Sequence, residues 1–239
     1  MSSFKKDYID RALSGELVLT KFLDFEEQKE INYSKQHGIN ICLEGGYELA
    51  ERKRAIISMY DDITFEDYKI KIYEILFESD IKTITHRHIL GTIMSLGINR
   101  NSFGDIIITG NNYYLFVSDE ISKYIEQNFT MVNHIPLKLR EICDIKDIIL
   151  PKQIEETINV SSMRLDAIIS RTLNKSRNDS SEIITKGLVL INHKECLNVS
   201  QNVKINDIIS IRHFGRIEIL EVVKTTKKDR LILKIGVKK

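Results

Sequence analysis

Apolar and polar positions alternate most regularly over residues 161–192. Apolar side chains recur there at helical spacing and share one face: Leu165, Ile168, Ile169, Thr172 and Leu173. Ser176, followed three residues later by Asp179, indicates the capped start of a second helix, and Gly187 indicates its left-handed end. The apolar run 188–192 then has the length and composition of a strand. The pattern therefore predicts a helix, a turn, a second helix and a strand.

The N-terminal pattern predicts a small, mostly helical α/β domain. Residues 5–13 begin a helix, and a capping-box-like start at Asp24 begins a second helix that should reach residue 38. Residues 39–43 read as a short strand. The paired glycines that follow, Gly45 and Gly46, permit a sharp turn, but they lack the further glycine and the Lys-Ser/Thr spacing of a phosphate-binding loop.

The middle of the chain alternates strands and helices in a split order. Strands are expected at 68–77, 105–109, 113–117 and 129–134, with helices at 85–96 and 119–128. This β-α-β-β-α-β order is the ferredoxin-like arrangement that RNA-recognition motifs also use. Topology alone does not establish RNA binding, and adjacent Tyr113 and Tyr114 can place at most one ring outward for base stacking.

After the helix pair, the pattern predicts strands that complete a small sheet. They are expected at 196–200, 208–211, 217–223 and 231–235, the last two forming a hairpin. The sequence thus predicts an α+β protein of three small domains. Their expected ranges are 1–64, 65–150 and 161–239, with a linker at 151–160.

Charge divides the chain more sharply than its net value of +1 suggests. Residues 161–239 hold sixteen Lys and Arg against eight Asp and Glu, a net charge of +8, and residues 1–160 carry −7. A basic third that also holds the helix pair favours a polyanion-binding module attached to a body that is not drawn to nucleic acid.

Composition indicates a folded protein that stays in the cytoplasm. No apolar run approaches the length of a membrane span, and the first residues lack the apolar segment of a secretory signal. The three cysteines are odd in number and widely separated, so they suggest neither a disulfide framework nor a zinc site. His86 and His88 lie two positions apart on a predicted helix and make a poor metal pair. We expect no metal, no cofactor and no small-molecule substrate.

Cationic side chains flank the helix pair. Arg164 and Arg171 lie beside the apolar stripe of the first helix, and Lys175 and Arg177 lie at the turn. Together with Ser176 and the free backbone N–H groups at the start of the second helix, they would offer several phosphate ligands on one rigid surface. The alternative is a helical hairpin with solvated charges. Further positive charge is expected from Lys186, His193, Lys194, Arg212 and Arg216, and secondary contacts from Arg52, Arg54, Arg87 and Arg100.

The amino-acid sequence of this stretch resembles a known RNA-binding motif. R-L-D-x-x-[IL], then S-R, then I-x-x-G-x-V-x-[IV]-N resembles the αL motif of ribosomal protein S4 and its relatives. Where those relatives usually have Gly before Asp, this chain has Asn206 before Asp207. Because Asn tolerates a left-handed backbone, we expect the turn to be kept.

Two further motifs extend the resemblance over nearly the whole chain. They are Gly-Gly-Tyr-x-x-Ala-Glu-Arg-x-Arg at 45–54 and, at 86–106, a segment that starts His-Arg and ends Gly-Asp-Ile; Phe-Gly-Arg-Ile follows at 214–217. In this order they resemble the YlmH family of bacterial RNA-binding proteins. The resemblance implies three domains and binding to a large ribosomal subunit that bears a stranded peptidyl-tRNA. It implies RNA contact for Arg164 and Arg177.

One enzymatic alternative stays open. Pseudouridine synthases carry an Arg-Leu-Asp with a catalytic aspartate, and Asp166 stands in such a tripeptide. Here the tripeptide opens a helix of the binding module, where an acidic first turn is favoured by the helix dipole and can pair with a nearby Arg. We therefore expect a non-enzymatic, monomeric protein whose partners are rRNA, tRNA and the large ribosomal subunit.

Overall fold

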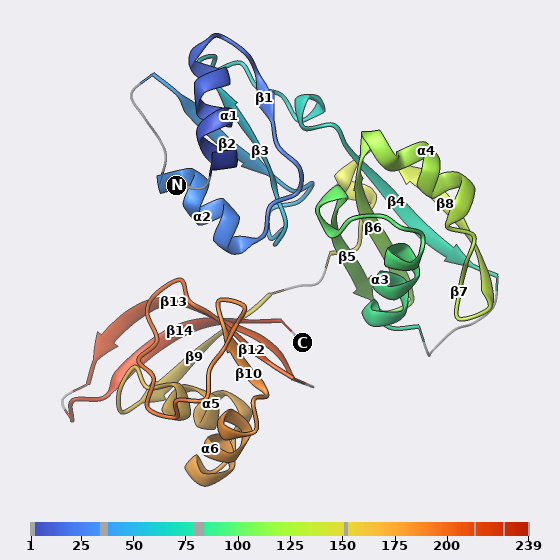
Figure 1. Cartoon of the computed structure of the whole chain (residues 1–239). Helices are drawn as coiled ribbons and strands as arrows, with labels where there is room; N and C mark the ends of the chain where they lie inside the picture. Colours follow the sequence, from blue (N-terminus) through green and yellow to red (C-terminus); the bar gives the residue numbers. More distant parts are fainter. Residues whose placement is uncertain are drawn as a thin grey trace. The chain divides into compact units, whose positions relative to one another are not determined.

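The structure is a computed structural model that describes residues 3–33, 38–78, 84–150, 153–212, 214–226 and 228–238. Its contacts divide the chain into two compact units, Met1–Pro151 and Lys152–Lys239. Both units combine helices with antiparallel sheets (Figure 1), which confirms the predicted α+β class.

The first part of the first unit is a three-stranded sheet with two helices. The strand order is β1-β3-β2, and the bounds are α1 Ser3–Leu13, β1 Val18–Leu19, α2 Phe25–Tyr33, β2 Asn40–Glu44 and β3 Arg54–Ser58. Both predicted helices are present, although α2 ends at Tyr33 and residues 34–37 lie outside the described residues. The sequence analysis missed β3. All five of its residues are buried, and its apolar side chains alternate between the two faces of the sheet.

The middle part of the first unit has the predicted split topology. Its elements are β4 Ile70–Phe77, α3 His86–Ser95, β5 Phe103–Thr109, β6 Asn112–Ser118, α4 Asp119–Asn128, β7 Met131–Val132 and β8 Ile135–Ile142, and short 3-10 turns occur at Glu66–Tyr68, Arg100–Ser102 and Ile145–Asp147. The strand order β5-β6-β4-β8-β7 gives the ferredoxin-like order with β4 next to β8.

The predicted last strand at 129–134 is wrong. The strand that closes the sheet is β8, and β7 is only a two-residue partner that pairs Val132 with Ile135. Asn133 and His134 both have positive φ, 50° and 64°, as the type I′ hairpin turn requires. A turn therefore interrupts the apolar pattern that the sequence analysis read as one strand.

Both faces of the middle sheet are covered. Tyr113 belongs to the core beneath α3 and α4, whereas Tyr114 belongs to a second core with Phe22 and Tyr47 of the N-terminal part. The side chains of Tyr113 and Tyr114 are 5% and 2% exposed. The face on which an RNA-recognition motif stacks bases is thus occupied by the protein's own N-terminal residues. Gly46 permits this close approach, since its φ is 96° and a Cβ there would lie 2.6 Å from the Phe116 ring.

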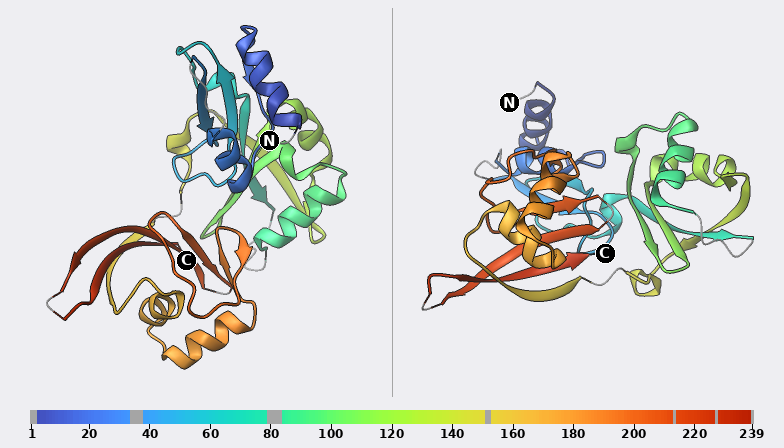
Figure 2. Two further views of the ribbon diagram at one scale, coloured as in Figure 1. Left: turned by 60° about the vertical axis from the view of Figure 1, so that its left-hand side comes forward. Right: turned by 90° about the horizontal axis from the view of Figure 1, so that it is seen from below.

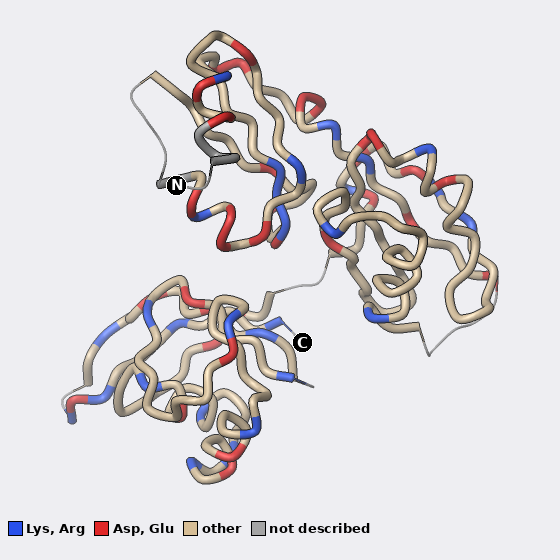
Figure 3. Tube along the Cα trace, in the orientation of Figure 1, with Lys and Arg blue, Asp and Glu red and all other residues tan. Residues whose placement is uncertain are grey.

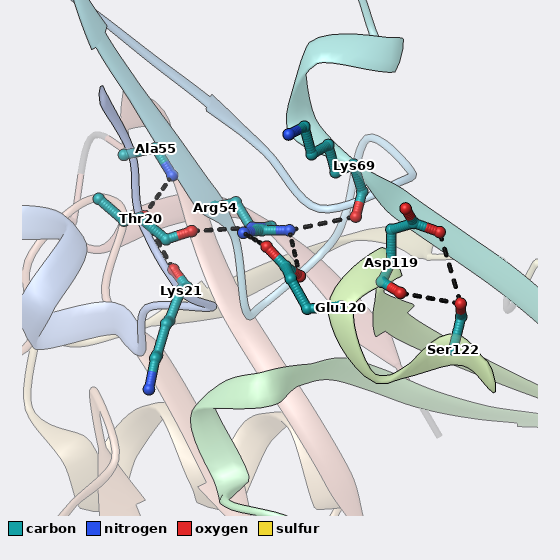
Figure 4. Close-up of polar contacts among 8 residues, drawn as sticks. All are labelled: Thr20, Lys21, Arg54, Ala55, Lys69, Asp119, Glu120 and Ser122. Atoms are coloured by element: carbon teal, nitrogen blue, oxygen red, sulfur yellow. Dashed lines mark hydrogen bonds and ion pairs between the residues drawn. The ribbon is translucent and has the colours of Figure 1, made fainter. Parts of the chain in front are cut away.

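Arg54 links the N-terminal sheet to the middle part (Figure 4). Its side chain is 3% exposed, and its Nε donates to the Thr20 carbonyl oxygen at 2.8 Å. The two Nη groups donate to the Lys69 carbonyl oxygen at 3.1 Å and to Glu120 Oε1 at 2.9 Å. The prediction of Arg54 as a secondary RNA contact is therefore wrong, because its guanidinium is buried and bound by its own chain.

The second unit is a six-stranded antiparallel sheet with two helices on one face (Figures 1 and 2). Its strand order is β11-β10-β12-β13-β14-β9. The bounds are β9 Ile154–Val160, α5 Leu165–Leu173, α6 Arg177–Thr185, β10 Val189–Ile191, β11 Lys194–Glu195, β12 Ile208–Ile211, β13 Gly215–Thr225 and β14 Leu231–Lys238. The predicted face of α5 is confirmed, since Leu165, Ile168 and Ile169 are fully buried against the sheet.

Two predictions for this unit are wrong. Residues 154–160, which were expected in a linker, form β9 and pair with β14 in seven registered positions. Residues 196–200 do not form a strand; the hairpin partner of β10 is β11, and Asn192 and His193 form its turn with φ of 49° and 66°. The expected left-handed Asn206 is confirmed, with φ of 68°.

None of the helices among the described residues is long and apolar enough to cross a membrane.

Candidate nucleic-acid interface

Arg164 is fixed at the start of α5 by its backbone and its side chain. The residue is the N-cap of α5 and forms an isolated antiparallel bridge with Asn202. Its Nε and Nη2 donate to Asp166 Oδ1 and Oδ2 at 3.0 and 3.1 Å, which makes a two-pronged ion pair. The Arg164 side chain remains 41% exposed, whereas that of Asp166 is 5% exposed. Arg164 is therefore oriented by a buried carboxylate while part of its guanidinium faces solvent.

Arg177 lies beside the same carboxylate. Burial of Asp166 opposes its ionisation, but the hydrogen bonds from Arg164 and the positive charges of Arg164 and Arg177 outweigh burial and lower the pKa of Asp166. Arg177 Nη2 also donates to Ser161 Oγ at 2.5 Å. Arg164 thus binds the buried acid directly, Arg177 lies in its neighbourhood, and both arginine side chains are accessible to solvent.

The start of α6 caps itself. Ser176 Oγ accepts from the Asp179 backbone N–H at 3.1 Å, and an Asp179 carboxylate oxygen accepts from the Ser176 backbone N–H at 3.2 Å. Hydrogen bonding of the Asp179 carboxylate to the side chain and the backbone N–H of Ser176, together with the charge of Lys175, lowers the pKa of Asp179. The prediction of free N–H groups here is thus partly wrong. The Asp179 N–H is taken, the Ser176 hydroxyl oxygen already accepts a hydrogen bond, and a carboxylate stands where a phosphate would approach.

The turn between α5 and α6 holds Lys175 in place. Asn174 adopts a left-handed conformation with φ of 53° and ends α5. Ser170 Oγ donates to the Lys175 carbonyl oxygen at 2.7 Å, and the Lys175 N–H donates to the Ser170 carbonyl oxygen. The Lys175 side chain is exposed beside the start of α6. The structure therefore places Lys175 and Arg177 at the turn between the helices and Arg164 at the start of α5; we call the surface that carries these three residues the α5–α6 surface.

The remaining predicted cations of this unit fall into separate places. Lys186 at the end of α6 pairs with Glu182 at 2.5 Å, and both side chains are mostly exposed. Arg212 and Arg216 flank a cavity of about 500 Å³ at the β12–β13 turn, together with Leu188 and Leu190. His193 and Lys194 lie at the β10–β11 turn, given above. Figure 3 shows Lys and Arg positions distributed over many of the strands and loops of this unit.

The predicted secondary contacts in the first unit are mostly engaged by their own chain. Arg52 Nη2 donates to the Phe22 carbonyl oxygen at 2.9 Å, and Arg100 Nη1 donates to the Phe103 carbonyl oxygen at 2.8 Å. Burial lowers the pKa of Arg100 to about 10, and the neighbouring charge of Arg52 acts in the same direction. Of the four residues, Arg87 alone is exposed, whereas Arg52 and Arg100 are half-buried.

Asp105 explains why the two motifs of the first unit occur together. Its carboxylate accepts hydrogen bonds from the Tyr47 hydroxyl at 2.8 Å and from the backbone N–H groups of Glu51 and Arg52 at 2.7 and 3.2 Å. The Gly-Asp-Ile of one motif thus holds the Gly-Gly-Tyr segment of the other. Asp105 and the Gly-Gly-Tyr segment therefore have a structural role, because this contact joins two parts of the first unit.

A cavity in the first unit has the wrong charge for RNA. It measures about 950 Å³, and the charged residues of its lining are six carboxylates and two lysines: Glu44, Glu48, Glu66, Asp119, Glu141, Asp144, Lys69 and Lys71. Within the described residues, no group of three or more His, Cys, Asp and Glu side chains is placed to hold a metal ion. His88 instead uses Nδ1 to accept from the Thr85 backbone N–H at the start of α3.

Sequence reasoning missed Arg230, Ser161 and Asn159 as neighbours of the predicted site. For Arg230 the sequence leaves a solvated hairpin tip and phosphate contact equally open, and in the structure its Nε donates to Asn159 Oδ1 at 2.7 Å. That contact depends on the pairing of β14 with β9, which join residues far apart in the chain. The local pattern carried no signal for it.

Comparison with known proteins matches one family model to each of the two units. Residues 64–146 match the family model described as the putative RNA-binding domain in YlmH, and residues 163–209 match that of the S4 domain. The ribosome-associated protein quality control protein P2 of Bacillus subtilis (strain 168) is 32% identical over 243 residues, covering 95% of this chain and 94% of that protein. The solved structure of the cell division protein ylmH from Streptococcus pneumoniae matches with a TM-score of 0.50 at 23% identity, over 62% of this chain and 97% of that one, a likeness of fold alone.

Proposed function

The chain belongs to the YlmH family, and from this membership we propose that it is a non-enzymatic, monomeric RNA-binding protein of ribosome-associated quality control. It acts in the cytoplasm and docks through its second unit on the large ribosomal subunit that carries a stalled peptidyl-tRNA. Its ligands there are the phosphates of folded rRNA and tRNA. The B. subtilis relative, whose name places it in ribosome-associated quality control, supports the setting of this proposal.

The observation that carries the proposal is that Arg164 and Arg177 both lie close to Asp166. Arg164 is hydrogen-bonded to this buried carboxylate, and Arg177 lies near enough for its charge to lower the pKa of the same carboxyl. Arg177 is held by its own hydrogen bond to Ser161 Oγ, and both arginine side chains are accessible to solvent. Guanidinium forks suit phosphate oxygens, and fixing them in advance reduces the entropy lost on binding. The net charge of +8 on residues 161–239 adds long-range attraction to a polyanion.

The geometry of Asp166 argues against the pseudouridine synthase alternative. A catalytic aspartate must reach its substrate, but the side chain of Asp166 is 5% exposed and both of its oxygens accept hydrogen bonds from Arg164. The family models that match this chain describe RNA-binding domains. We therefore assign Asp166 the task of positioning arginines.

Replacing Arg177 with Ala tests the proposal. The variant should cosediment less with large ribosomal subunits, and its RNA affinity should depend less steeply on salt by about one charge, because one phosphate contact is lost. Arg177 is exposed, so the thermal unfolding temperature should stay close to that of the wild type. Cosedimentation at several salt concentrations measures both quantities.

Lys146→Ala serves as the matched control, because it removes one positive charge from an 86% exposed side chain of the first unit. It should bind subunits like the wild type. Equal binding by Arg177→Ala and the wild type at all salt concentrations would contradict the proposed surface. A modified nucleoside formed in RNA incubated with the purified wild-type protein would instead support an enzyme.

A further inference from the structure

An open pocket of about 370 Å³ lies next to the α5–α6 surface and is lined by three arginines. They come from α5, from the first residue of α6 and from the β13–β14 hairpin: Arg171, Arg177 and Arg230. The remaining lining residues are Asn159, Val160, Ser161, Ala167 and Ser170. No carboxylate lines the pocket, so three positive charges face one another there without an anion among the lining side chains.

Hydrogen bonds hold two of the three guanidinium groups in place. Arg177 Nη2 donates to Ser161 Oγ, and Arg230 donates through Nε to Asn159 Oδ1 at 2.7 Å and through Nη2 to the Asn159 carbonyl oxygen at 3.3 Å. The partners are neutral oxygens at the end of β9 and just after it. These hydrogen bonds hold Arg177 and Arg230 in place without bringing an anion into the pocket, since Asp166, the carboxylate near Arg177, does not line it. Among the described residues, Nη1 of neither arginine has a hydrogen-bond partner, so both Nη1 groups can serve a ligand.

Three guanidinium groups that line one pocket repel one another, and an anion bound among them relieves this repulsion. A phosphate oxyanion matches this arrangement best, because its oxygens accept several hydrogen bonds from planar N–H forks at once. The serine hydroxyls and the Asn159 side chain supply neutral polar groups beside it. All three arginines are exposed, so a phosphate within a polymer can reach the pocket.

We propose that Arg171, Arg177 and Arg230 together bind one phosphate of an RNA backbone, with Asn159 and Ser161 as positioning residues. This inference rests on the proposed RNA-binding function and extends it. Asn159, Ser161 and Arg230 all lie outside residues 163–209, which match the S4 domain. The RNA footprint of the second unit therefore reaches past the S4 helices to β9 and to the β13–β14 hairpin.

Arg230→Gln in the full chain tests the pocket, with Lys228→Gln as its control. Lys228 is exposed on the same hairpin, two residues away, and does not line the pocket. Both variants lose one positive charge. Arg230→Gln should weaken binding of ribosomal RNA about tenfold and reduce the salt dependence by about one charge, whereas Lys228→Gln should change the affinity less than about threefold. Arg230→Lys should recover the salt dependence but only part of the affinity, because it keeps the charge and loses the fork.

The outcomes separate the pocket from the proposed function. Equal RNA affinities of Arg230→Gln and Lys228→Gln, while Arg177→Ala still binds weakly, would overturn the pocket and leave RNA binding intact. Full RNA binding by Arg177→Ala as well would overturn both. If Arg230→Gln is unfolded by circular dichroism, the decision passes to the folded Arg230→Lys, for which full wild-type affinity would overturn the pocket.

Inorganic phosphate distinguishes a polymer phosphate from a free one. If millimolar phosphate raises the thermal unfolding temperature of the wild type but not of Arg230→Gln, and RNA affinity is the same for both proteins, the pocket binds free phosphate and its assignment to RNA is wrong. Competition of phosphate with RNA, lost in Arg230→Gln, would support the assignment.

Discussion

At the scale of single residues, the second unit uses a buried acid to aim basic side chains. Asp166 is shielded from solvent, yet it stays charged because Arg164 grips both of its oxygens. The Arg-Leu-Asp tripeptide, which also suggested an enzyme, is explained by this pair. The sequence analysis predicted that Asp166 pairs with a nearby Arg, and the structure confirms it, because the two residues lie two positions apart at the start of one helix.

Replacing Arg164 with Gln should lower the urea midpoint of the second unit, because the charge of the buried Asp166 then loses its partner. Urea unfolding at pH 7 measures the change. The pKa of Asp166 is lowered in the folded state, so the pair stabilises the wild type at neutral pH, and this stabilisation disappears as the pH falls through that lowered pKa.

The double variant Arg164→Gln with Asp166→Asn provides the control, since it removes both charges. It should regain part of the lost stability but not RNA affinity. A double variant that is no more stable than Arg164→Gln would show that the ion pair is not the source of the effect.

In the first unit, two arginines that were predicted to contact RNA instead hold the fold together. Arg52 and Arg54 stand in a charged cluster that resembles a solvated turn, but both guanidinium groups donate to carbonyl oxygens of the N-terminal segment. Their role depends on β3 being the central strand of a sheet whose other strands lie elsewhere in the chain. Sequence reasoning saw the charges and lacked the strand pairing that buries Arg54.

At the scale of elements, the parts with local signals were predictable. The Ser176–Asp179 capping box fixes the start of α6, and Gly187 with φ of 69° follows its end. β3 and β9 were missed for opposite reasons. β3 is buried on both faces, so its sequence shows no alternation of apolar and polar residues. The first four residues of β9 are exposed, so they show no apolar face. Both gain their stability by pairing with distant strands, which no short window of sequence reveals.

The acidic cap of α6 gives a prediction of its own. Asp179→Asn keeps a side-chain oxygen that can accept from the Ser176 N–H but removes the negative charge beside Lys175 and Arg177. RNA affinity should rise about two- to threefold at low salt, since a like charge no longer repels the phosphate. Filter binding across a salt series measures it, and the gain should disappear at high salt.

Asp179→Ala is the comparison, because it removes both the charge and the acceptor and should cost helix stability as well. An RNA affinity of Asp179→Asn equal to that of the wild type at low salt would place the bound phosphates away from the start of α6.

At the scale of the whole molecule, the net charge is divided unevenly along the chain. Residues 161–239 carry the positive charge and residues 1–160 are acidic. The ferredoxin-like sheet in the first unit is covered on both faces, so the fold it shares with RNA-recognition motifs does not bring their exposed base-stacking face with it. The sequence analysis predicted this topology but not the covering, which depends on Phe22 and Tyr47 returning to a sheet made of later residues.

The Arg54–Glu120 pair makes the stability of the first unit depend on pH. Burial raises the pKa of Glu120, but hydrogen bonds from Arg54 and Ser118 outweigh burial and lower it to about 2. A lowered pKa means that the pair stabilises the folded state above the usual Glu range and loses this effect as the pH falls toward 2. The urea midpoint of the wild type should therefore drop more between pH 5 and pH 3 than that of Glu120→Gln.

The two partners should differ in size of effect at pH 7. Because the Glu120 side chain is 56% exposed, Glu120→Gln should cost less than about 1 kcal/mol in unfolding free energy. Arg54→Met should cost about 2–4 kcal/mol, because the Thr20 and Lys69 carbonyl oxygens lose their donor in the interior. Equal pH profiles for Glu120→Gln and the wild type would contradict the role of this pair.

The pairing of β9 with β14 sets the order in which the chain matures. In chain order β9 is the first strand of the second unit and β14 is the last. Because β9 pairs with β14, β9 has no strand to pair with until β14 has been synthesised. The first unit precedes it and contains its own cores, so it can fold while translation continues. A nascent chain that stops before β14 would therefore leave β9 unpaired, and the second unit can complete its sheet only after its last strand has been made.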